Sequence, residues 1–306
     1  MINLALIGAG KWGKNYLNTA SNAPDCAIKY VCAQTKRTLD SLPNNYIKVT
    51  SPKDLLKYKD IDGIIIASPS ATHFSLTKLF LLNGFNLLIE KPLTTNYTEA
   101  LELYKIWKSK KVKVLVGHIY LYNPAFQKFK EIFESKNNFK YITFEGLKSS
   151  VRKDSSVIWD WGPHPISIFL SLIKYPPLRI RAVKNINKIE ASLIFPKGFA
   201  AKLKISWFGD KKIRKLVAQG KSKKIQFDDT NTNNQKISVY SKKHQIQYPN
   251  YSFEPALKVE LNEFVQALQN KKNIVSDINM GLNVVKILSA IEKSVDNGGE
   301  LIKLDE

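Results

Sequence analysis

The chain has few cysteines and lacks long apolar runs, and each scarcity excludes a class of protein. Its 306 residues include two cysteines, Cys26 and Cys32, where a disulfide would need a sharp reversal of the chain. We expect both thiols to be reduced, and without Cys or His partners at ligand spacing we expect no metal site. The longest apolar stretches, such as 166–173, are far short of the roughly 20 residues of a membrane span.

The N-terminal segment has no basic leader and only a short apolar run before a glycine turn. This pattern does not predict a signal peptide, and so low a cysteine count is typical of a reducing compartment. We therefore expect a cytoplasmic protein. Hydrophobic residues make up 44% and charged residues 24% of the chain, which is typical of a globular protein with about two domains.

Acidic residues are few relative to basic ones. Lys and Arg total 47 against 26 Asp and Glu, a formal net charge of +21, which raises nucleic acid or an anionic small molecule as a partner. The basic pairs, such as Lys110-Lys111 and Lys211-Lys212, are scattered and do not alternate with aromatic residues. We interpret them as a lysine-rich surface and expect neither a nucleic-acid nor a membrane partner, with attraction for a phosphorylated substrate as the alternative.

Residues 1–118 alternate short apolar runs with helical patterns. Apolar runs lie at 3–7, 28–33, 47–49, 63–67, 87–89 and 112–116, and helical patterns begin near 12, 71 and 97. Strands separated by helices of this length require parallel crossovers, which predicts a doubly wound sheet. The unbroken run Ile64-Ile65-Ile66 supports this interpretation, because a parallel strand is buried on both faces.

The pattern changes after residue 120. Apolar residues alternate along 189–195 and 203–207 with the turn Pro196-Lys197-Gly198 between them, which is typical of antiparallel strands. The polar stretch 228–235 predicts a hairpin loop. Two amphipathic helices close the chain, with apolar stripes formed by Leu257, Leu261, Phe264, Val265 and Leu268, and by Leu282, Val285, Leu288 and Ile291.

The predicted fold class is therefore α/β with two domains. Residues 1–120 are expected to form an N-terminal Rossmann domain with a doubly wound parallel sheet that binds NAD(P). Residues 121–306 are expected to form a C-terminal α+β domain for substrate binding and oligomerisation, with an open, mostly antiparallel sheet. The exposed face of such a sheet favours self-association, so we expect a homo-oligomer, either a dimer or a tetramer.

A glycine motif follows the first predicted strand. The segment Gly8-Ala9-Gly10-Lys11-Trp12-Gly13 joins that strand to a helix, the context that a dinucleotide site requires. The first glycine makes the turn, the second admits the pyrophosphate, and the third packs helix against strand. We therefore expect Gly8, Gly10, Lys11, Trp12 and Gly13 to contact a nicotinamide dinucleotide, whose phosphates the helix N-terminus attracts.

The second strand lacks the acidic residue that binds the adenosine ribose in NAD enzymes, which stands roughly 20 residues past the glycines. The segment reads Gln34-Thr35-Lys36-Arg37, and Asp40 lies too far along. A hydroxyl and two cations suit a 2′-phosphate, so the sequence favours NADP. The alternative is that Lys36 and Arg37 are solvated and Gln34 serves either cofactor.

Further candidate residues follow the fourth and fifth strands. Ser68-Pro69 and His73 come after one, and Glu90-Lys91-Pro92 ends the other. Parallel sheets bind ligands at the carboxyl ends of their strands. We therefore expect these residues to lie near the cofactor, with Lys91 directed at the reacting groups.

The sequence resembles the Gfo/Idh/MocA family, that is, glucose–fructose oxidoreductase, inositol dehydrogenase and their relatives. The resemblance spans nearly the whole chain, and its Glu-Lys-Pro and Asp-x-x-x-His elements are more specific than the glycines alone. The matching motifs are Gly8-x-Gly10-x-x-Gly13, Ser68-Pro69 with His73, Glu90-Lys91-Pro92, Gly117-His118, Asp160-Trp161-Gly162-Pro163-His164, and Glu254-Pro255 with Leu257, Glu260 and Phe264.

The resemblance implies that Lys91, Asp160 and His164 occupy the catalytic positions of an NAD(P)-dependent dehydrogenase acting on CH–OH groups. Their chemistry is suitable. Loss of a hydride from a carbinol carbon requires a base for the hydroxyl proton, here His164. Lys91 would stabilise the developing alkoxide, and Asp160 would contact the substrate or the lysine.

Four residues after the sixth strand are further substrate candidates, namely His118, Tyr120, Tyr122 and Asn123. Asn123 is alternatively a helix cap, and His118 and the tyrosines are alternatively core residues. The motifs 117–124 and 159–164 resemble a branch that oxidises nucleotide sugars in surface polysaccharide biosynthesis. This implies a sugar or nucleotide-sugar substrate. The competing hypothesis is a non-catalytic sensor or scaffold that binds a dinucleotide on the same fold.

Overall fold

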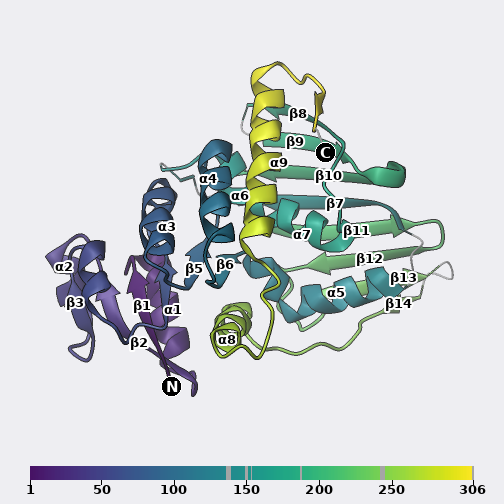
Figure 1. Cartoon of the computed structure of the whole chain (residues 1–306). Coiled ribbons are helices and arrows are strands. Elements are labelled where there is room, and N and C mark those ends of the chain that lie inside the picture. Colours follow the sequence, from purple (N-terminus) through teal and green to yellow (C-terminus); the bar gives the residue numbers. More distant parts are fainter. Residues whose placement is uncertain (136–138, 149–150, 153, 187, 242–244, 305–306) are drawn as a thin grey trace. The chain divides into compact units, whose positions relative to one another are not determined.

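The computed structural model describes residues 1–135, 139–148, 151–152, 154–186, 188–241 and 245–304 (Figure 1). They fall into two compact units, one of Met1–Ile119 with Ala256–Val285 and the other of Tyr120–Pro255 with Lys286–Glu306. The predicted boundary near residue 120 assigned 256–285 to the C-terminal domain. In the structure these residues group with the first unit instead. The assignment of cofactor and substrate binding to separate domains stays a prediction.

In the described residues, the first unit contains a six-stranded parallel sheet with the strand order β3-β2-β1-β4-β5-β6. This confirms the predicted Rossmann sheet. The registers pair Ile7 with Cys32 and with Ile66, and Glu90 with Gly117, so the strands end at a common edge. The strands are β1 Ile2–Ile7, β2 Cys26–Cys32, β3 Ile47–Val49, β4 Gly63–Ile66, β5 Leu87–Glu90 and β6 Val114–Gly117.

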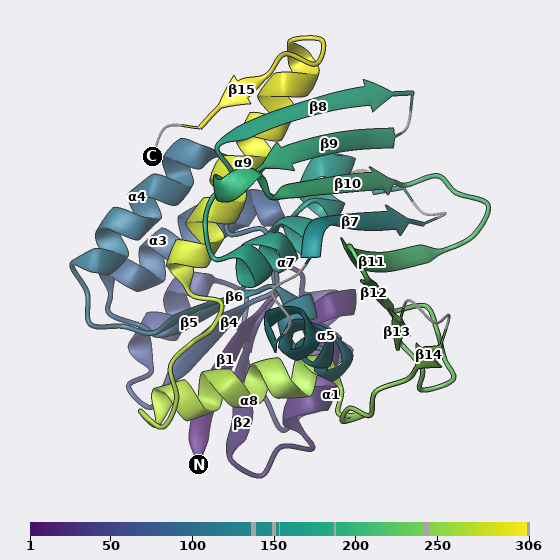
Figure 2. The same cartoon turned by 90° about the vertical axis from the view of Figure 1, so that its right-hand side faces the viewer.

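Helices connect these strands at the lengths that parallel crossovers need. Helix α3 packs with α4, and α1 packs with α8, on opposite faces of the sheet (Figure 2). Asn96 caps α4 by accepting a hydrogen bond from Glu99 N at 3.2 Å. The helices are α1 Lys11–Ala20, α2 Lys36–Asp40, η1 Pro52–Lys57, η2 Ser70–Thr72, α3 His73–Leu82, α4 Tyr97–Lys108 and α8 Ala256–Leu268.

Helix α8 and the segment after it explain why residues 256–285 group with the first unit. The ring of Phe264 packs directly on Gly63 in β4, where a methyl group would lie 2.9 Å from the ring. After α8, Val116 N donates a hydrogen bond to Ser276 O at 2.7 Å. The chain therefore returns to the Rossmann sheet because the apolar stripe of α8 packs against that sheet.

The second unit contains, in the described residues, a nine-stranded sheet with the order β14-β13-β12-β11-β7-β10-β9-β8-β15. Its strand pairs are antiparallel except β7 with β10, which confirms the predicted mostly antiparallel sheet. The strands are β7 Phe139–Leu147, β8 Arg179–Asn185, β9 Lys188–Ile194, β10 Ala200–Ser206, β11 Ile213–Gly220, β12 Lys223–Asp228, β13 Ile237–Ser241, β14 Ile246–Gln247 and β15 Ile302–Lys303.

Apolar side chains of this sheet alternate as the sequence predicted. Ile189, Ala191 and Leu193 on β9 are buried, and Leu203 and Ile205 on β10 are buried beside them. Helices α5 and α7 lie over one face (Figure 1). The helical elements are η3 Ile119–Tyr122, α5 Pro124–Ser135, α6 Val157–Trp161, α7 Pro163–Ile173, η4 Pro196–Gly198 and α9 Ile278–Asp296, which begins in the first unit.

The two cysteines stand at opposite ends of β2 and are free thiols, as predicted. Burial, with smaller contributions from nearby Asp25 and Asp54, raises the pKa of each to about 11, so both are neutral core groups. Within the part of the chain that the structure describes, no helix combines the length and the apolar character needed to cross a bilayer.

Candidate functional site

The glycine loop joins β1 to α1 with the geometry that the motif predicts. Gly8 has a φ of 95°, a left-handed conformation that favours glycine. A methyl group on Gly13 would lie 1.9 Å from Gly8 O, so only glycine allows α1 to approach the loop. Gly10 differs, because a methyl group there would meet nothing within 4 Å. The space beside Gly10 is therefore open to a ligand.

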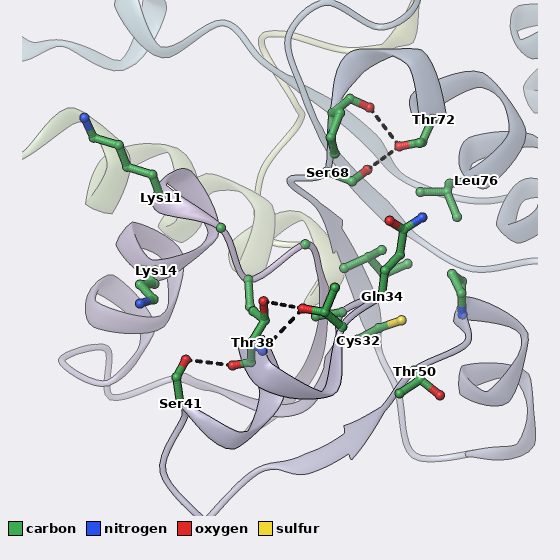
Figure 3. A pocket seen from close by; sticks show the side chains of 18 of the residues that line it. Lys11, Lys14, Cys32, Gln34, Thr38, Ser41, Thr50, Ser68, Thr72 and Leu76 are labelled. Atoms are coloured by element: carbon green, nitrogen blue, oxygen red, sulfur yellow. Dashed lines mark hydrogen bonds between the residues drawn. The ribbon is translucent and has the colours of Figure 1, made fainter. Parts of the chain in front are cut away.

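A cavity of about 890 Å³ lies at this loop, entirely within the first unit (Figure 3). Seven of the predicted cofactor residues line it, namely Gly8, Gly10, Lys11, Gln34, Thr35, Ser68 and Pro69. Further polar lining comes from residues that sequence reasoning missed, Lys14, Thr38, Ser41, Thr50, Thr72 and Ser75. Lys14, Thr38 and Thr72 each lie about one helical turn after a predicted residue, and this spacing could have identified them from the sequence.

Hydroxyl groups surround the end of the cavity beyond β2. The Thr35 and Thr38 hydroxyl oxygens are 2.7 Å apart, and Ser41 Oγ donates to Thr38 O at 2.7 Å. Thr35 Oγ1 also caps α2 by accepting from Thr38 N at 3.3 Å. Lys36 and Arg37, which the sequence suggested for a 2′-phosphate, are exposed and do not line the cavity.

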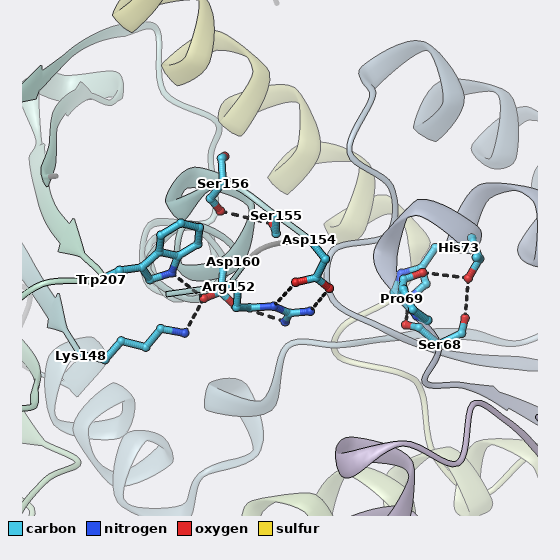
Figure 4. A network of polar contacts seen from close by, with 11 residues as sticks. Ser68, Pro69, His73, Lys148, Arg152, Asp154, Ser155, Ser156, Asp160 and Trp207 are labelled. Carbon is cyan, nitrogen blue, oxygen red and sulfur yellow. Dashed lines mark hydrogen bonds and ion pairs between the residues drawn. The ribbon is translucent and has the colours of Figure 1, made fainter. Parts of the chain in front are cut away.

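His73 is buried and does not line the cavity. Its Nδ1 is 2.7 Å from Pro92 O. Its Nε2 is 3.0 Å from Ser68 O (Figure 4). Burial lowers the pKa of His73, although both carbonyls oppose the shift. The ring therefore ties the loops after β4 and β5 together, and we interpret His73 as a support of the pocket wall rather than a cofactor ligand.

Glu90 and Trp12 are hydrogen-bonded to each other and do not line the cavity. Trp12 Nε1 and Tyr16 Oη donate hydrogen bonds to Glu90 Oε1, the latter at 2.7 Å. Lys91 N donates to Glu90 Oε2 at 3.2 Å. Glu90 therefore links the glycine-loop helix to the backbone of Lys91, a partially buried residue directly after β5.

His118 is fully buried at the end of β6. Its Nδ1 is 2.7 Å from Ser276 Oγ, and in the described residues its Nε2 has no hydrogen-bond partner. Burial, and then the charge of Lys91, lowers the pKa of His118 to about 3. His118 is therefore a buried, neutral imidazole near Lys91, and in the described residues one of its ring nitrogens makes no hydrogen bond.

In the second unit, Asp160 lies on α6 among three donors (Figure 4). Its Oδ2 accepts from Lys148 Nζ at 2.6 Å and from Trp207 Nε1 at 2.9 Å, and its Oδ1 accepts from Arg152 Nη1 at 3.4 Å. Asp160 itself is 7% exposed. Sequence reasoning did not identify Lys148, Arg152 or Trp207, because they come from separate strands and loops.

His164 lies in the first turn of α7 against aromatic rings. The Tyr120 ring centroid is 5.0 Å from that of His164, and Trp161 meets the same imidazole edge-on at 5.8 Å. Tyr120 also packs against Phe144 and is buried, as is Tyr122. These contacts place the two tyrosines in the core of the second unit, the alternative that the sequence left open.

Asn123 caps α5. Its Oδ1 accepts from Ala125 N at 2.9 Å, and its Nδ2 donates to Asp229 Oδ1 at 3.3 Å. Asp229 also accepts from Lys236 Nζ at 2.8 Å and forms an ion pair with Arg214 at 3.4 Å. The cap interpretation of Asn123 therefore holds, and the second unit carries a charged cluster that sequence reasoning missed.

Comparison with known families identifies the first unit. Residues 2–118 match the family model described as the oxidoreductase family with an NAD-binding Rossmann fold, GFO_IDH_MocA. Residues 2–118 are therefore similar to the NAD-binding domain of the Gfo/Idh/MocA oxidoreductase family. The resemblance drawn from the sequence motifs is thereby confirmed.

Individual relatives agree. The chain is 31% identical over 134 residues to the uncharacterized oxidoreductase YrbE of Bacillus subtilis, covering 42% of this chain and 39% of that protein. It is 29% identical over 126 residues to the UDP-N-acetylglucosamine 3-dehydrogenase of Acidithiobacillus ferrooxidans, covering 40% of each. The matched segments thus span well under half of these relatives.

Solved structures are similar over nearly the full length. The Acidithiobacillus ferrooxidans enzyme GnnA superimposes with a TM-score of 0.86 and 21% identity, covering 97% of this chain and 98% of that one. GenD2 from gentamicin A biosynthesis, solved in complex with NAD, has a TM-score of 0.86 and 16% identity, covering 100% and 97%. At these identities the likeness establishes the fold.

The glycine loop yields a paired prediction. Gly13→Ala is expected to destabilise the protein by about 3 kcal/mol, because its methyl group would overlap Gly8 O. Gly10→Ala, the matched control, has room for its methyl group and is expected to lose less than about 1 kcal/mol.

The same two variants separate folding from ligand binding. Gly10→Ala is expected to weaken dinucleotide binding roughly tenfold or more, because its methyl group would occupy the space into which the pyrophosphate fits. Thermal unfolding and a tryptophan-fluorescence titration with NAD and NADP measure the two effects. Equal stability of Gly13→Ala and Gly10→Ala would contradict the loop geometry.

Proposed function

We propose that this protein is an NAD(P)-dependent dehydrogenase or reductase that transfers a hydride to or from a secondary carbinol of a sugar or nucleotide sugar. The supporting observation is the family's Rossmann fold with a cavity at Gly8 and Gly10, continuous with the polar residues after β2 and β4. A dinucleotide fits this lining, because Gly10 leaves its side open and Ser68 and Thr35 offer hydroxyl groups.

Lys91, Asp160 and His164 carry the chemistry in this proposal. When bound, the oxidised dinucleotide supplies the hydride acceptor. As the carbinol C–H bond breaks, His164 accepts the hydroxyl proton and the C–O bond becomes a carbonyl. The Lys91 ammonium donates a hydrogen bond to the oxygen while negative charge develops on it. Asp160, held by Lys148 and Trp207, contacts the substrate in this proposal.

The substrate class rests on the relatives and on charge. One relative is named as a UDP-N-acetylglucosamine 3-dehydrogenase and another, from Rhizobium meliloti, as an inositol 2-dehydrogenase, so ring hydroxyls are substrates in this family. The net charge of +21 attracts a diphosphate-bearing sugar. We place such a reaction in surface polysaccharide biosynthesis.

The cofactor proposal favours NADP. Among the described residues that line the cavity there is no aspartate or glutamate, so nothing there repels a 2′-phosphate. The lining includes the cations Lys11 and Lys14 and the hydroxyls of Thr35, Thr38 and Ser41. A 2′-phosphate would be hydrogen-bonded by the hydroxyls and attracted by the cations.

Gln34→Asp tests this proposal. A carboxylate at the end of β2 is expected to repel a 2′-phosphate and to bind a ribose 2′-hydroxyl, which shifts the ratio of kcat/KM values toward NAD by roughly tenfold or more. Gln34→Asn is the matched control and keeps an uncharged amide at the same position. Steady-state kinetics with both cofactors measure the ratio. An unchanged ratio in Gln34→Asp would place the ribose elsewhere.

An assay of the wild-type protein tests the function itself. Purified protein is incubated with NAD or NADP and a panel of UDP-linked aminosugars, uronic acids and inositols, and formation of reduced nicotinamide is followed by absorbance. The proposal expects turnover with at least one of them. Dinucleotide binding without hydride transfer to any member would favour the alternative function, a non-catalytic sensor or scaffold.

A further inference from the structure

A buried tyrosine in the first unit lies between two buried carboxyl groups. Tyr16 Oη, on α1, is 2.7 Å from Glu90 Oε1 and 2.9 Å from Glu260 Oε1. Tyr16 and Glu260 are 0% exposed and Glu90 is 9% exposed. Two helices and one strand thus meet at one polar cluster, because Tyr16 belongs to α1, Glu90 ends β5 and Glu260 belongs to α8.

The number of protons constrains this cluster. A tyrosine hydroxyl has one proton to donate, whereas an ionised carboxylate can only accept. Tyr16 therefore satisfies both contacts only if it donates to one carboxyl group and accepts from the other. One of the two glutamates must then carry a proton.

The remaining contacts identify which glutamate is protonated. Glu90 also accepts from Trp12 Nε1 and from Lys91 N, both of which stabilise a carboxylate. Glu260 Oε2 is buried and makes no hydrogen bond in the described residues. An ionised Glu260 would therefore leave a charged oxygen unsatisfied in the protein interior, which is costly. The proton belongs on Glu260, which donates to Tyr16, which in turn donates to Glu90.

The electrostatic surroundings agree with this assignment. Burial and then the negative charge of Glu90 raise the pKa of Glu260 well above its usual value, Glu263 adds a smaller rise, and the contact with Tyr16 alone opposes it. Burial also raises the pKa of Glu90, but hydrogen bonds from Tyr16 and Trp12 and the charge of Lys91 oppose that shift. The cluster is therefore asymmetric in the direction that the hydrogen bonds require.

We propose that Glu260 is a neutral carboxylic acid in the working protein and positions Lys91 through the chain Glu260, Tyr16, Glu90 and the Lys91 backbone N–H. The role of Lys91 in this chain rests on the proposed function. Glu260 itself touches no reacting group and is a positioning residue. By orienting the Tyr16 hydroxyl, Glu260 keeps Glu90 ionised and fixed beside Lys91. Trp12 connects the same Glu90 carboxylate to the glycine loop.

Glu260→Gln tests the proton assignment, because its amide NH₂ can donate to Tyr16 as a neutral acid does but cannot ionise. An acid whose pKa is raised by folding stabilises the protein fully below its unfolded pKa, and this contribution is lost as pH rises toward the folded pKa. The melting temperature of the wild type is therefore expected to fall as pH rises. The melting temperature of Glu260→Gln is expected to lack this part of the decrease.

Glu263→Gln is the matched control on the same helix. Glu263 accepts from Val275 N at 2.9 Å and lies 3.3 Å from Lys272 Nζ, so its replacement is expected to lower stability without removing the pH-dependent loss. Infrared difference spectra between wild type and Glu260→Gln provide a second measurement. They should contain the carbonyl stretch of a protonated carboxylic acid. A carboxylate band in its place, or a wild-type pH slope in Glu260→Gln, would overturn the proton assignment.

Kinetics test the positioning role. Tyr16→Phe breaks the chain and is expected to lower kcat roughly tenfold with little change in the KM for the dinucleotide, whereas Glu260→Gln, the conservative variant that keeps a donor to Tyr16, is expected to lower kcat less than Tyr16→Phe does. An unchanged kcat in Tyr16→Phe would overturn the positioning role. The stability and infrared measurements need no substrate, so they decide the proton assignment even if the proposed hydride transfer proves wrong.

Discussion

Lys91→Met is expected to lower the rate of hydride transfer roughly 10²–10³-fold, the usual effect of removing one donor that stabilises a developing oxyanion. The methionine keeps an apolar stem at the end of β5 but cannot donate a hydrogen bond. Glu90 accepts a hydrogen bond from the backbone N–H of Lys91, and the substitution leaves that N–H in place. Dinucleotide affinity should change little.

Single-turnover kinetics with saturating cofactor and substrate measure this effect without interference from product release. Lys36→Met is the control, because Lys36 is an exposed lysine on α2 that does not line the cavity. It should transfer hydride at the wild-type rate. If Lys91→Met also did so, Lys91 would have no catalytic role, and the proposed assignment of the reacting groups would be wrong.

His164→Ala is expected to lower kcat roughly 10²–10⁴-fold, the contribution typical of a positioned general base. The imidazole lies against the rings of Tyr120 and Trp161, so alanine leaves a space bounded by two aromatic side chains. Added imidazole is therefore expected to restore part of the activity by occupying that space and accepting the proton.

The rescue separates a base from a packing residue. The rate of His164→Ala is measured at increasing imidazole concentration, with wild type as the control for inhibition. Circular dichroism and thermal unfolding check that the variant is folded. A kcat close to that of wild type would remove His164 from the mechanism. Loss of activity with no response to imidazole, in a variant that has lost its stability, would point to packing.

Most of the first unit was predictable because its determinants are local. A strand that ends at Ile7, a helix that begins at Lys11 and apolar strands such as Gly63–Ile66 define parallel crossovers within about a hundred residues. The second sheet was predictable in type from alternating burial along β9 and β10. The parallel pairing of β7 with β10 was not, because register between distant strands leaves no local pattern.

The candidate site was predicted less completely. The sequence placed Gln34 and Thr35 correctly at the cavity, but it grouped Lys36 and Arg37 with them by position in the chain. In the structure α2 begins at Lys36, which turns both side chains into exposed positions and brings Thr38 into the lining instead. A single turn of helix therefore decided which side chains line the cavity.

The order of residues by itself determined the nucleotide-binding fold, the glycine loop and the set of residues to examine, because turns, helix caps and apolar periodicity act over short distances. Tertiary structure alone decided that α8 returns to the first unit and brings Glu260 to Tyr16. It also decided that Asp160 meets Lys148 and Trp207. Such contacts depend on burial and shape between distant segments, where a buried acid needs a partner that sequence spacing does not reveal.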